Sequence, residues 1–137
     1  MKVGREMNIK LKEISRDDLK VGDTVGIART VNCGWLSTFR HRKIIPVKIT
    51  RITPKRTKIE TDIYEEHGKS EKFYEYDENA RKENELVEKF VLVKDMEFEL
   101  NQFENKYGLK WMDDEDILEM ADYVEKIMKI LDKYRKE

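Results

Sequence analysis

The sequence predicts an α+β fold, with antiparallel strands first and helices last. Apolar and polar residues alternate through much of residues 7–76, and this period of two is typical of half-buried strands. From about residue 95 the apolar spacing changes to three and four, which is typical of helices. We therefore expect a small antiparallel β-barrel or strongly bent sheet of about five or six strands over residues 1–94. A C-terminal helical extension, residues 95–137, should pack on it to give a single structural unit.

The first elements are a strand, a short helical turn and a second strand. Residues 7–14 alternate in the manner of a strand. Ser15 precedes two aspartates, and a serine cap with acids in the first turn predicts one helical turn. Gly22-Asp23 is a turn sequence that leads into a strand through Val25 and Ile27.

A long loop, residues 30–42, follows and has no clear apolar period. It carries two large aromatic residues, Trp35 and Phe39. An aromatic side chain in a loop over the end of a barrel usually fills the core, and this is the role we expect for Trp35.

The clearest prediction is a β-hairpin formed by residues 43–53 and 58–64, with the turn at Pro54-Lys-Arg56. Both segments alternate and are rich in β-branched residues. Pro46 has no amide hydrogen to donate, so it should lie at a sheet edge or a bulge. Antiparallel pairing about the turn gives three facing pairs: Val47 with Ile63, Ile49 with Thr61, and Lys48 with Asp62.

Two further strands are expected after this hairpin. Residues 66–70 form a turn, and residues 71–76 form a strand with Phe73 facing inward and Tyr74 and Tyr76 facing outward. Residues 77–85 are densely polar and predict either a loop or the start of a helix. The apolar run Phe90-Val-Leu-Val93 favours a buried strand that closes the barrel.

Two helices complete the predicted fold. A short helix should begin at Asp95 and end at Gly108, since a glycine commonly terminates a helix. A second helix should begin near Asp113, with acids at its start and bases near its end, as the helix dipole favours. Its apolar stripe predicts a core contact, and a surface for a second copy of the chain remains an alternative. The stripe comprises Ile117, Met120, Ala121, Val124, Ile127, Met128, Leu131 and Tyr134.

Two segments, Leu19-Lys-Val-Gly-Asp-Thr-Val25 and Ile49-Thr-Arg-Ile-Thr-Pro-Lys-Arg-Thr57, resemble the small SH3-like β-barrel accessory proteins of bacteriophages and mobile elements. The resemblance covers the first half of the chain. It implies an accessory binding role and no catalytic residues.

Charge is divided unevenly along the chain. Residues 1–58 hold fifteen Lys/Arg against five Asp/Glu, whereas residues 59–137 hold thirteen against twenty-four, within a net charge of −1. The basic half suits phosphates or acidic protein surfaces. Between residues 40 and 58 there are eight bases and no acid: Arg40, Arg42, Lys43, Lys48, Arg51, Lys55, Arg56 and Lys58.

The leading functional hypothesis from the sequence is nucleic-acid binding through this basic hairpin. Cations on a projecting hairpin can neutralise a phosphate backbone. Three tyrosines expected on outward faces, Tyr64, Tyr74 and Tyr76, can stack on bases. The alternative for the charges is a solvated hairpin whose edge they protect from pairing with other chains.

The alternative function is an interaction protein, such as a phage or mobile-element inhibitor that binds a host or defence protein. Its docking surface would be the basic hairpin or the acidic helices. A homodimer through the C-terminal helix is also possible. No apolar run reaches the length of about 20 residues needed to span a bilayer, so we expect no membrane partner and a cytoplasmic location.

Catalysis finds little support in the sequence. Cys33 is the only cysteine, and His41 and His67 are the only histidines available as bases. Glycine-rich phosphate loops and nucleophile elbows are lacking, and Glu65, Glu66 and His67 make at most a poor divalent site. We expect a non-enzymatic protein without cofactor or metal.

Overall fold

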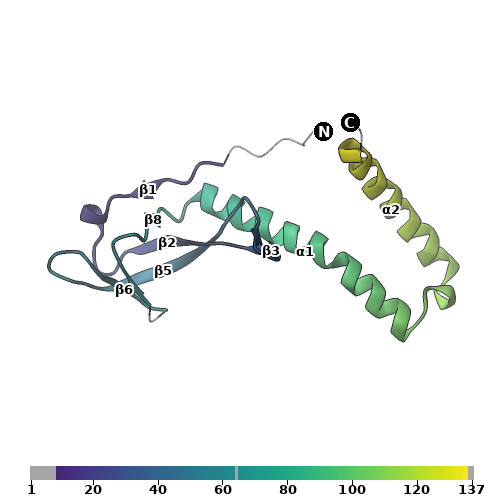
Figure 1. Ribbon diagram of the computed structural model, residues 1–137, viewed down its shortest axis with the longest axis horizontal. Helices are drawn as coiled ribbons and strands as arrows, with labels where there is room; N and C mark the ends of the chain where they lie inside the picture. The colour runs from purple at the N-terminus through teal and green to yellow at the C-terminus, as the bar shows by residue number, and fades with distance from the viewer. Residues whose placement is uncertain (1–8, 64, 136–137) are drawn as a thin grey trace. The chain divides into compact units, whose positions relative to one another are not determined.

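The computed structural model describes residues 9–63 and 65–135, and these fall into two compact units, one before and one after the boundary between residues 93 and 94. We call them the sheet unit and the helical unit. The α+β fold is confirmed, but the main sheet stays open and does not close into a barrel (Figure 1). Its order is β1 (Glu13–Ile14), β8 (Phe73–Tyr74), β2 (Thr24–Arg29), β5 (Lys43–Ile52), β6 (Ile59–Thr61) and β7 (Glu66–His67). A separate two-stranded sheet pairs β3 (Asn32–Gly34) with β4 (Ser37–Thr38).

The core of the sheet unit lies on one face of this bent sheet. On β5, Val47 and Ile49 are buried while Lys48 and Thr50 are exposed, which is the alternation that a half-buried strand requires. Phe73 is buried, as its inward orientation predicts. The buried cluster comprises Leu19, Val25, Ile27, Val47, Ile49, Ile59 and Phe73.

The predicted β5–β6 hairpin is confirmed, with a shorter second strand. Ile49 pairs with Thr61, and the Lys48 amide donates to Asp62 Oδ1 at 3.0 Å. The register shifts between Ile49 and Arg51, and β6 ends at Thr61. Ile63 therefore lies outside the ladder, and its predicted pairing with Val47 is wrong.

Pro46 occupies the edge position that its missing amide hydrogen predicts. Only β2 pairs with β5 at this point, because β6 reaches no further than Ile49. Just before Pro46, a side chain takes the place of a strand: the Ile44 amide donates to Asn84 Oδ1 at 2.6 Å, and Asn84 Nδ2 donates to the Ile44 carbonyl at 2.8 Å. This edge of β5 is therefore capped by a helix rather than left unpaired.

The short elements before β2 agree with the sequence. The 3-10 turn η1 (Arg16–Asp18) begins after Ser15, whose Oγ accepts from the Asp17 amide at 3.4 Å. Gly22 takes φ of 97° in the turn before β2, a conformation that glycine adopts without steric cost. The predicted strand over residues 7–14 is reduced to β1, and residues 7 and 8 lie outside the described residues.

The first helix begins far earlier than predicted. Helix α1 spans Glu78–Lys106, so the expected strand at Phe90–Val93 is wrong and Asp95 lies inside the helix rather than at its cap. Once a helix is nucleated, each added residue brings a further hydrogen bond, and this outweighs the β preference of four apolar residues. Gly108, with φ of 82°, ends this stretch as expected.

The helical unit consists of the end of α1, a 3-10 turn η2 (Leu109–Trp111) and α2 (Asp114–Arg135). Helix α2 is confirmed, but its stripe is not core: residues 94–135 include no buried residue. In the described part of the chain, neither α1 nor α2 contains a segment apolar enough to cross a bilayer.

Candidate functional site

The basic segment of residues 40–58 does not form one uncompensated ridge. Arg51 Nη1 lies 3.0 Å from Glu60 Oε2, and Lys58 Nζ lies 3.4 Å from Glu66 Oε1. The first pair joins β5 to β6, and the second joins the residue before β6 to β7. Exposed pairs of this kind contribute little to stability, but they reduce the positive potential that a polyanion would meet.

Two further arginines of the segment are used inside the scaffold. Arg56 lies at the predicted turn, yet its Nη1 donates to the carbonyls of Arg16 (3.0 Å) and Leu19 (2.8 Å). Arg42 Nη2 donates to Tyr74 Oη at 3.4 Å, and its guanidinium lies over the Tyr74 ring. Neither group projects freely from the hairpin tip.

The remaining bases of the segment are more accessible. Lys43, Lys48 and Lys55 are exposed and form no ion pair with any residue the structure describes. Arg40 is also exposed, and its guanidinium lies 5.4 Å from the centroid of the Phe39 ring. The accessible positive surface is therefore smaller than the sequence suggests.

The tyrosines do not form an outward stacking surface. Tyr74 is only 7% exposed, so its predicted outward orientation is wrong. Tyr76 is half-buried, and its Oη accepts from Asn84 Nδ2 at 3.3 Å. Tyr64 lies outside the described residues. Tyr74 and Tyr76 thus contribute to the packing between β8, α1 and the start of β5.

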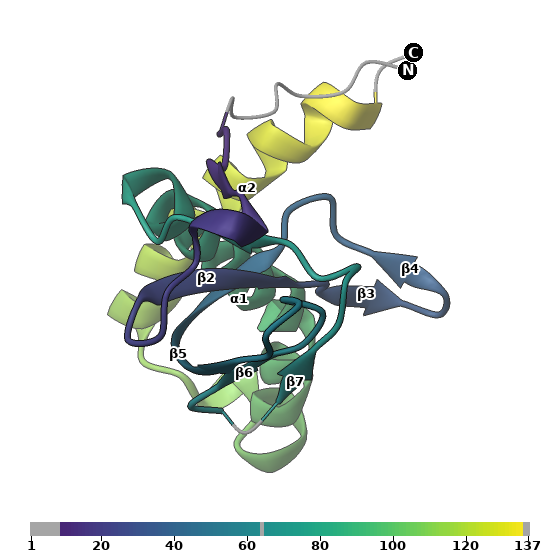
Figure 2. The same ribbon diagram turned by 90° about the vertical axis from the view of Figure 1, so that its left-hand side faces the viewer.

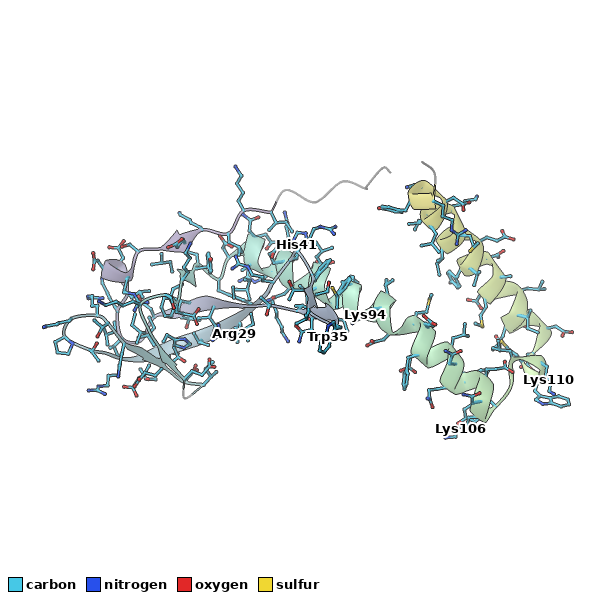
Figure 3. All side chains as sticks on the ribbon, viewed as in Figure 1. Arg29, Trp35, His41, Lys94, Lys106 and Lys110 are labelled. Atoms are coloured by element: carbon cyan, nitrogen blue, oxygen red, sulfur yellow. The ribbon has the colours of Figure 1, made fainter. Side chains whose placement is uncertain are left out.

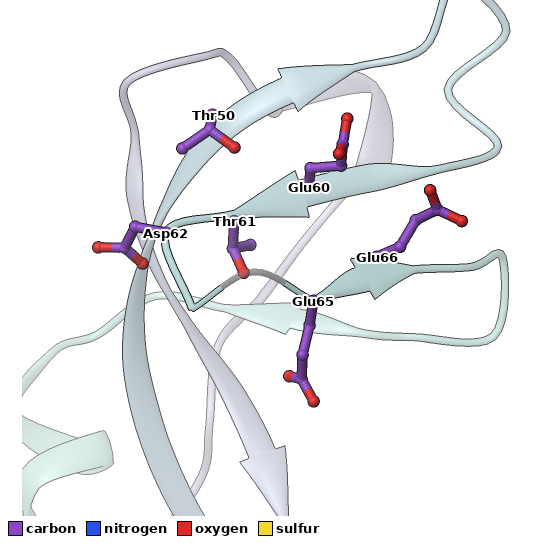
Figure 4. A pocket seen from close by; sticks show the side chains of 6 residues that line it. All are labelled: Thr50, Glu60, Thr61, Asp62, Glu65 and Glu66. Carbon is purple, nitrogen blue, oxygen red and sulfur yellow. The ribbon is translucent and has the colours of Figure 1, made fainter.

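A shallow pocket of about 450 Å³ near β6 is lined by four carboxylates and two threonines. Figure 4 shows that its side chains come from β5, β6, β7 and the segment between β6 and β7: Thr50, Glu60, Thr61, Asp62, Glu65 and Glu66. Three of the carboxylates pair with Arg51, Arg29 and Lys58. Within residues 9–63 and 65–135, no three His, Cys, Asp or Glu side chains gather as a cation site.

A polar network ties β2 to the turn between β7 and β8. Arg29 donates to Glu71 Oε1 and Glu65 Oε2, each at 2.9 Å. His67 lies between Glu71 Oε1 (2.9 Å) and Thr61 Oγ1 (3.2 Å). Partial burial lowers the pKa of Arg29, but the hydrogen bonds and charges of Glu71 and Glu65 outweigh it and raise the pKa overall. The His67 imidazole is thus engaged in hydrogen bonds within the scaffold.

A second buried pair fixes the end of the long loop to α1. His41 Nδ1 lies 2.5 Å from Glu83 Oε1, and both side chains are buried. Glu83 Oε2 also accepts from the Arg42 amide at 3.2 Å. Cys33 Sγ lies 3.4 Å from Ser37 Oγ. His41 and His67 each face a carboxylate rather than the Cys33 thiol.

The loop of residues 30–42 is where the structure departs most from expectation. Strands β3 and β4 form a small hairpin, residues 32–38, which we call the finger; Figure 2 shows it projecting from the main sheet. Its base is closed by the Phe39 amide, which donates to the Val31 carbonyl at 2.8 Å. Trp35 and Leu36 form its tip, and each is 90% exposed (Figure 3 labels Trp35). The predicted core role of Trp35 is wrong.

The aromatic residue that fills the expected packing role is Phe39. Its ring stacks on Phe90 of α1, with centroids 3.9 Å apart and an interplanar angle of 6°. Phe39 also lies 5.4 Å from the His41 ring. The base of the finger is thus held rigidly on α1, whereas its tip contacts solvent.

The tip combines exposed apolar surface with an unfavourable backbone. Leu36 has φ of 52°, a left-handed conformation that costs an L-amino acid roughly 1–2 kcal/mol. Residues 30–39 contain no charged side chain, although Arg29 and Arg40 flank them. The sequence carries little signal for this hairpin, because Asn32 is a poor strand former and Trp35-Leu36 is not one of the two-residue turns that favour a hairpin.

Comparisons with protein-family models, with curated proteins and with solved structures find no match to this chain.

Proposed function

We propose that this protein is a non-enzymatic interaction module that docks on another protein by inserting Trp35 and Leu36 of the finger into an apolar pocket of its partner. The observation that carries the proposal is the 90% exposure of both side chains on a turn whose leucine is left-handed. Folding gains little from either side chain in this position, because neither is removed from water. A strained and exposed apolar tip fits a binding role.

The chemistry of the finger favours a protein surface as its ligand. Tryptophan is among the residues that contribute most binding energy when buried at the centre of an interface. The absence of charge across residues 30–39 removes the cost of burying an unpaired charge in a partner pocket. Arg40, which follows the finger and is exposed, would then lie at the rim, where charges steer association.

The scaffold supports docking by holding the base of the finger still. The stacking of Phe39 on Phe90, the pairing of His41 with Glu83 and the Phe39–Val31 backbone bond all fix the chain at this end. A preorganised element loses less conformational entropy when it binds.

Nucleic-acid binding is the second candidate, and it rests on Lys43, Lys48 and Lys55. These three side chains are exposed and have no ion pair with a described residue. Its support is weaker because Arg51 and Lys58 are neutralised by nearby glutamates and Arg42 and Arg56 are used in the scaffold.

Site-specific photo-crosslinking in cells that produce the protein tests the first proposal. A photoreactive amino acid at position 36 should capture one discrete protein, because the proposal places this side chain inside the apolar pocket of the partner. The same amino acid at position 55, an exposed turn of the other hairpin, is the matched control and should not capture it. Trp35→Ala should abolish the adduct at position 36. Equal capture from both positions would contradict docking by the finger.

Tryptophan fluorescence separates a protein ligand from the other classes. The chain has two tryptophans, so Trp111→Phe leaves Trp35 as the sole reporter. The captured protein should shift the Trp35 emission to the blue. A salt-sensitive change with a single-stranded oligonucleotide would favour nucleic acid instead, and a blue shift with anionic phospholipid vesicles would indicate a membrane surface.

A further inference from the structure

The helical unit leaves an ordered apolar surface uncovered. Residues 94–135 include no buried residue, although α2 alone is 22 residues long. Soluble monomers rarely expose long contiguous apolar surfaces, and those that exist usually mark an interaction site. The question is therefore what covers this surface.

The spacing of the apolar residues on α2 is that of a helix that packs against another helix. Six residues follow one another at intervals of three, four, three, four and three, as the a and d positions of a heptad do. Five of them are 37–49% exposed and the sixth, Ile127, is half-buried. These stripe residues are Ile117, Met120, Val124, Ile127, Leu131 and Tyr134.

The end of α1 offers a second stripe of the same kind. Met96, Leu100 and Phe103 recur at four and three residues, and Tyr107 follows four residues later. All four are exposed or half-buried. None of the four is therefore fully covered within the helical unit.

Charge along α2 indicates which helix fits the stripe. From Asp113 to Glu125 there are seven acids and no base, whereas from Lys126 to Arg135 there are four bases and one acid. Two copies of α2 placed side by side in parallel would set acids against acids. Placed antiparallel, each acidic half meets the basic half of the other copy.

We infer that the helical unit is a dimerisation module in which α2 packs antiparallel on α2 of a second copy of this chain. A 22-residue helix is about 33 Å long, a short interface for two helices alone. The α1 stripes of both copies would extend the apolar contact. The inference is independent of the proposed role of the finger, which belongs to the sheet unit.

The mass of the full-length protein in solution tests the inference directly. Sedimentation equilibrium over a wide concentration range should give twice the 16.5 kDa of one chain. The double variant Val124→Glu/Ile127→Glu places four like charges in the middle of the contact and should give one chain mass. Leu118→Glu is the matched control, because Leu118 lies on the opposite face of α2 and is exposed; this variant should remain dimeric.

Two results would overturn the inference whatever the variants do. A wild-type protein that stays monomeric at the highest concentration would mean that α2 packs on its own α1 or binds a different protein. A dimer that survives Val124→Glu/Ile127→Glu, with helicity unchanged by circular dichroism, would place the contact elsewhere.

Ionic strength tests the antiparallel orientation. Salt screens charges that are exposed, so an antiparallel dimer should weaken, with a dissociation constant that rises several-fold from low salt to 0.5 M. In a parallel dimer the acidic halves repel, and the same change of salt would tighten it. A dissociation constant that falls with salt therefore rejects the antiparallel arrangement.

Discussion

The sheet unit and the helical unit use their apolar residues in opposite ways. Eight large side chains of the sheet unit, including Phe73 and Leu19, are less than 2% exposed. The described residues of the helical unit carry an equally regular apolar pattern, and none of these apolar side chains is fully buried. Burial of apolar area is the main stabilising term in folding, so the sheet unit supplies its own stability. The pattern of the helical unit becomes useful only when another surface covers it.

The finger shows the same contrast on a smaller scale within the sheet unit. Phe39 at its base is packed on Phe90, whereas Trp35 at its tip contacts solvent. Exposed apolar residues thus gather at the tip of the finger and along the helical unit. Both surfaces are ones that association with other molecules would cover.

The largest expected effect on stability comes from a substitution in the core of the sheet unit. Two phenylalanines, one buried and one exposed, allow a matched comparison. Phe73→Ala should lower the free energy of unfolding by about 3–5 kcal/mol, because it removes a buried ring and leaves a cavity. Phe98→Ala removes the same group from α1 at a site that is 62% exposed, and should change the stability by at most about 0.5 kcal/mol. Urea denaturation followed by circular dichroism provides both values. Similar losses for the two variants would contradict the contrast between the units.

A smaller effect is expected from the buried pair that holds the loop on α1. Glu83→Ala leaves His41 and the Arg42 amide without their acceptor. A buried donor that loses its partner costs about 1–3 kcal/mol, so the sheet unit should lose about that much stability. Glu85→Ala, two residues away and exposed, is the control and should be nearly neutral. A neutral Glu83→Ala would show that the pair does not anchor the loop.

Arg56 tests whether the basic turn serves the scaffold or a ligand. Arg56→Ala removes two hydrogen bonds to the carbonyls of Arg16 and Leu19, and should cost about 1–2 kcal/mol. Lys55→Ala beside it should leave the stability unchanged, because Lys55 is exposed. Thermal unfolding of the two variants compares them. If Lys55→Ala destabilised the protein as much, the division between scaffold and surface cations would fail.

Sequence patterns identified the elements whose side chains interact locally. The β5–β6 hairpin, the Ser15 cap, the stop at Gly108 and helix α2 all follow from alternation, turn chemistry or capping within a few residues. The Ile49–Thr61 pair was also predictable, because the turn at residues 54–56 fixes the register close to it.

The predictions failed where the outcome depends on distant residues. The run at Phe90–Val93 is strand-like in isolation, but it lies in a helix that starts twelve residues earlier. Tyr74 is buried because Arg42, thirty-two residues away, packs over its ring. For the candidate site, the neutralisation of Arg51 and Lys58 depends on strand pairing, which residue composition does not specify. Trp35 is expected in the core because an aromatic residue in a loop over a barrel end usually fills it, and its position at the tip of a hairpin overrides this preference.

The smallest expected change in stability is at Leu36. This substitution should affect folding and partner binding in opposite directions. Glycine adopts a φ of 52° without the steric cost that leucine has there. Relief of roughly 1–2 kcal/mol of strain is partly offset by the greater backbone entropy of glycine in the unfolded chain, roughly 0.5–1 kcal/mol. Leu36→Gly should therefore stabilise the sheet unit by about 0.5 kcal/mol, measured by urea denaturation.

The same variant should weaken binding of the captured partner, measured by the fluorescence of Trp35 in the Trp111→Phe background, since half of the apolar tip is lost. Leu36→Met retains an apolar side chain and the strained backbone, so it should preserve binding and leave the stability nearly unchanged. A protein that becomes more stable and binds less well is expected only if Leu36 is kept for contact with another molecule. If Leu36→Gly destabilised the fold by more than 1 kcal/mol, the leucine would have a structural role, and docking by the tip would lose its main support.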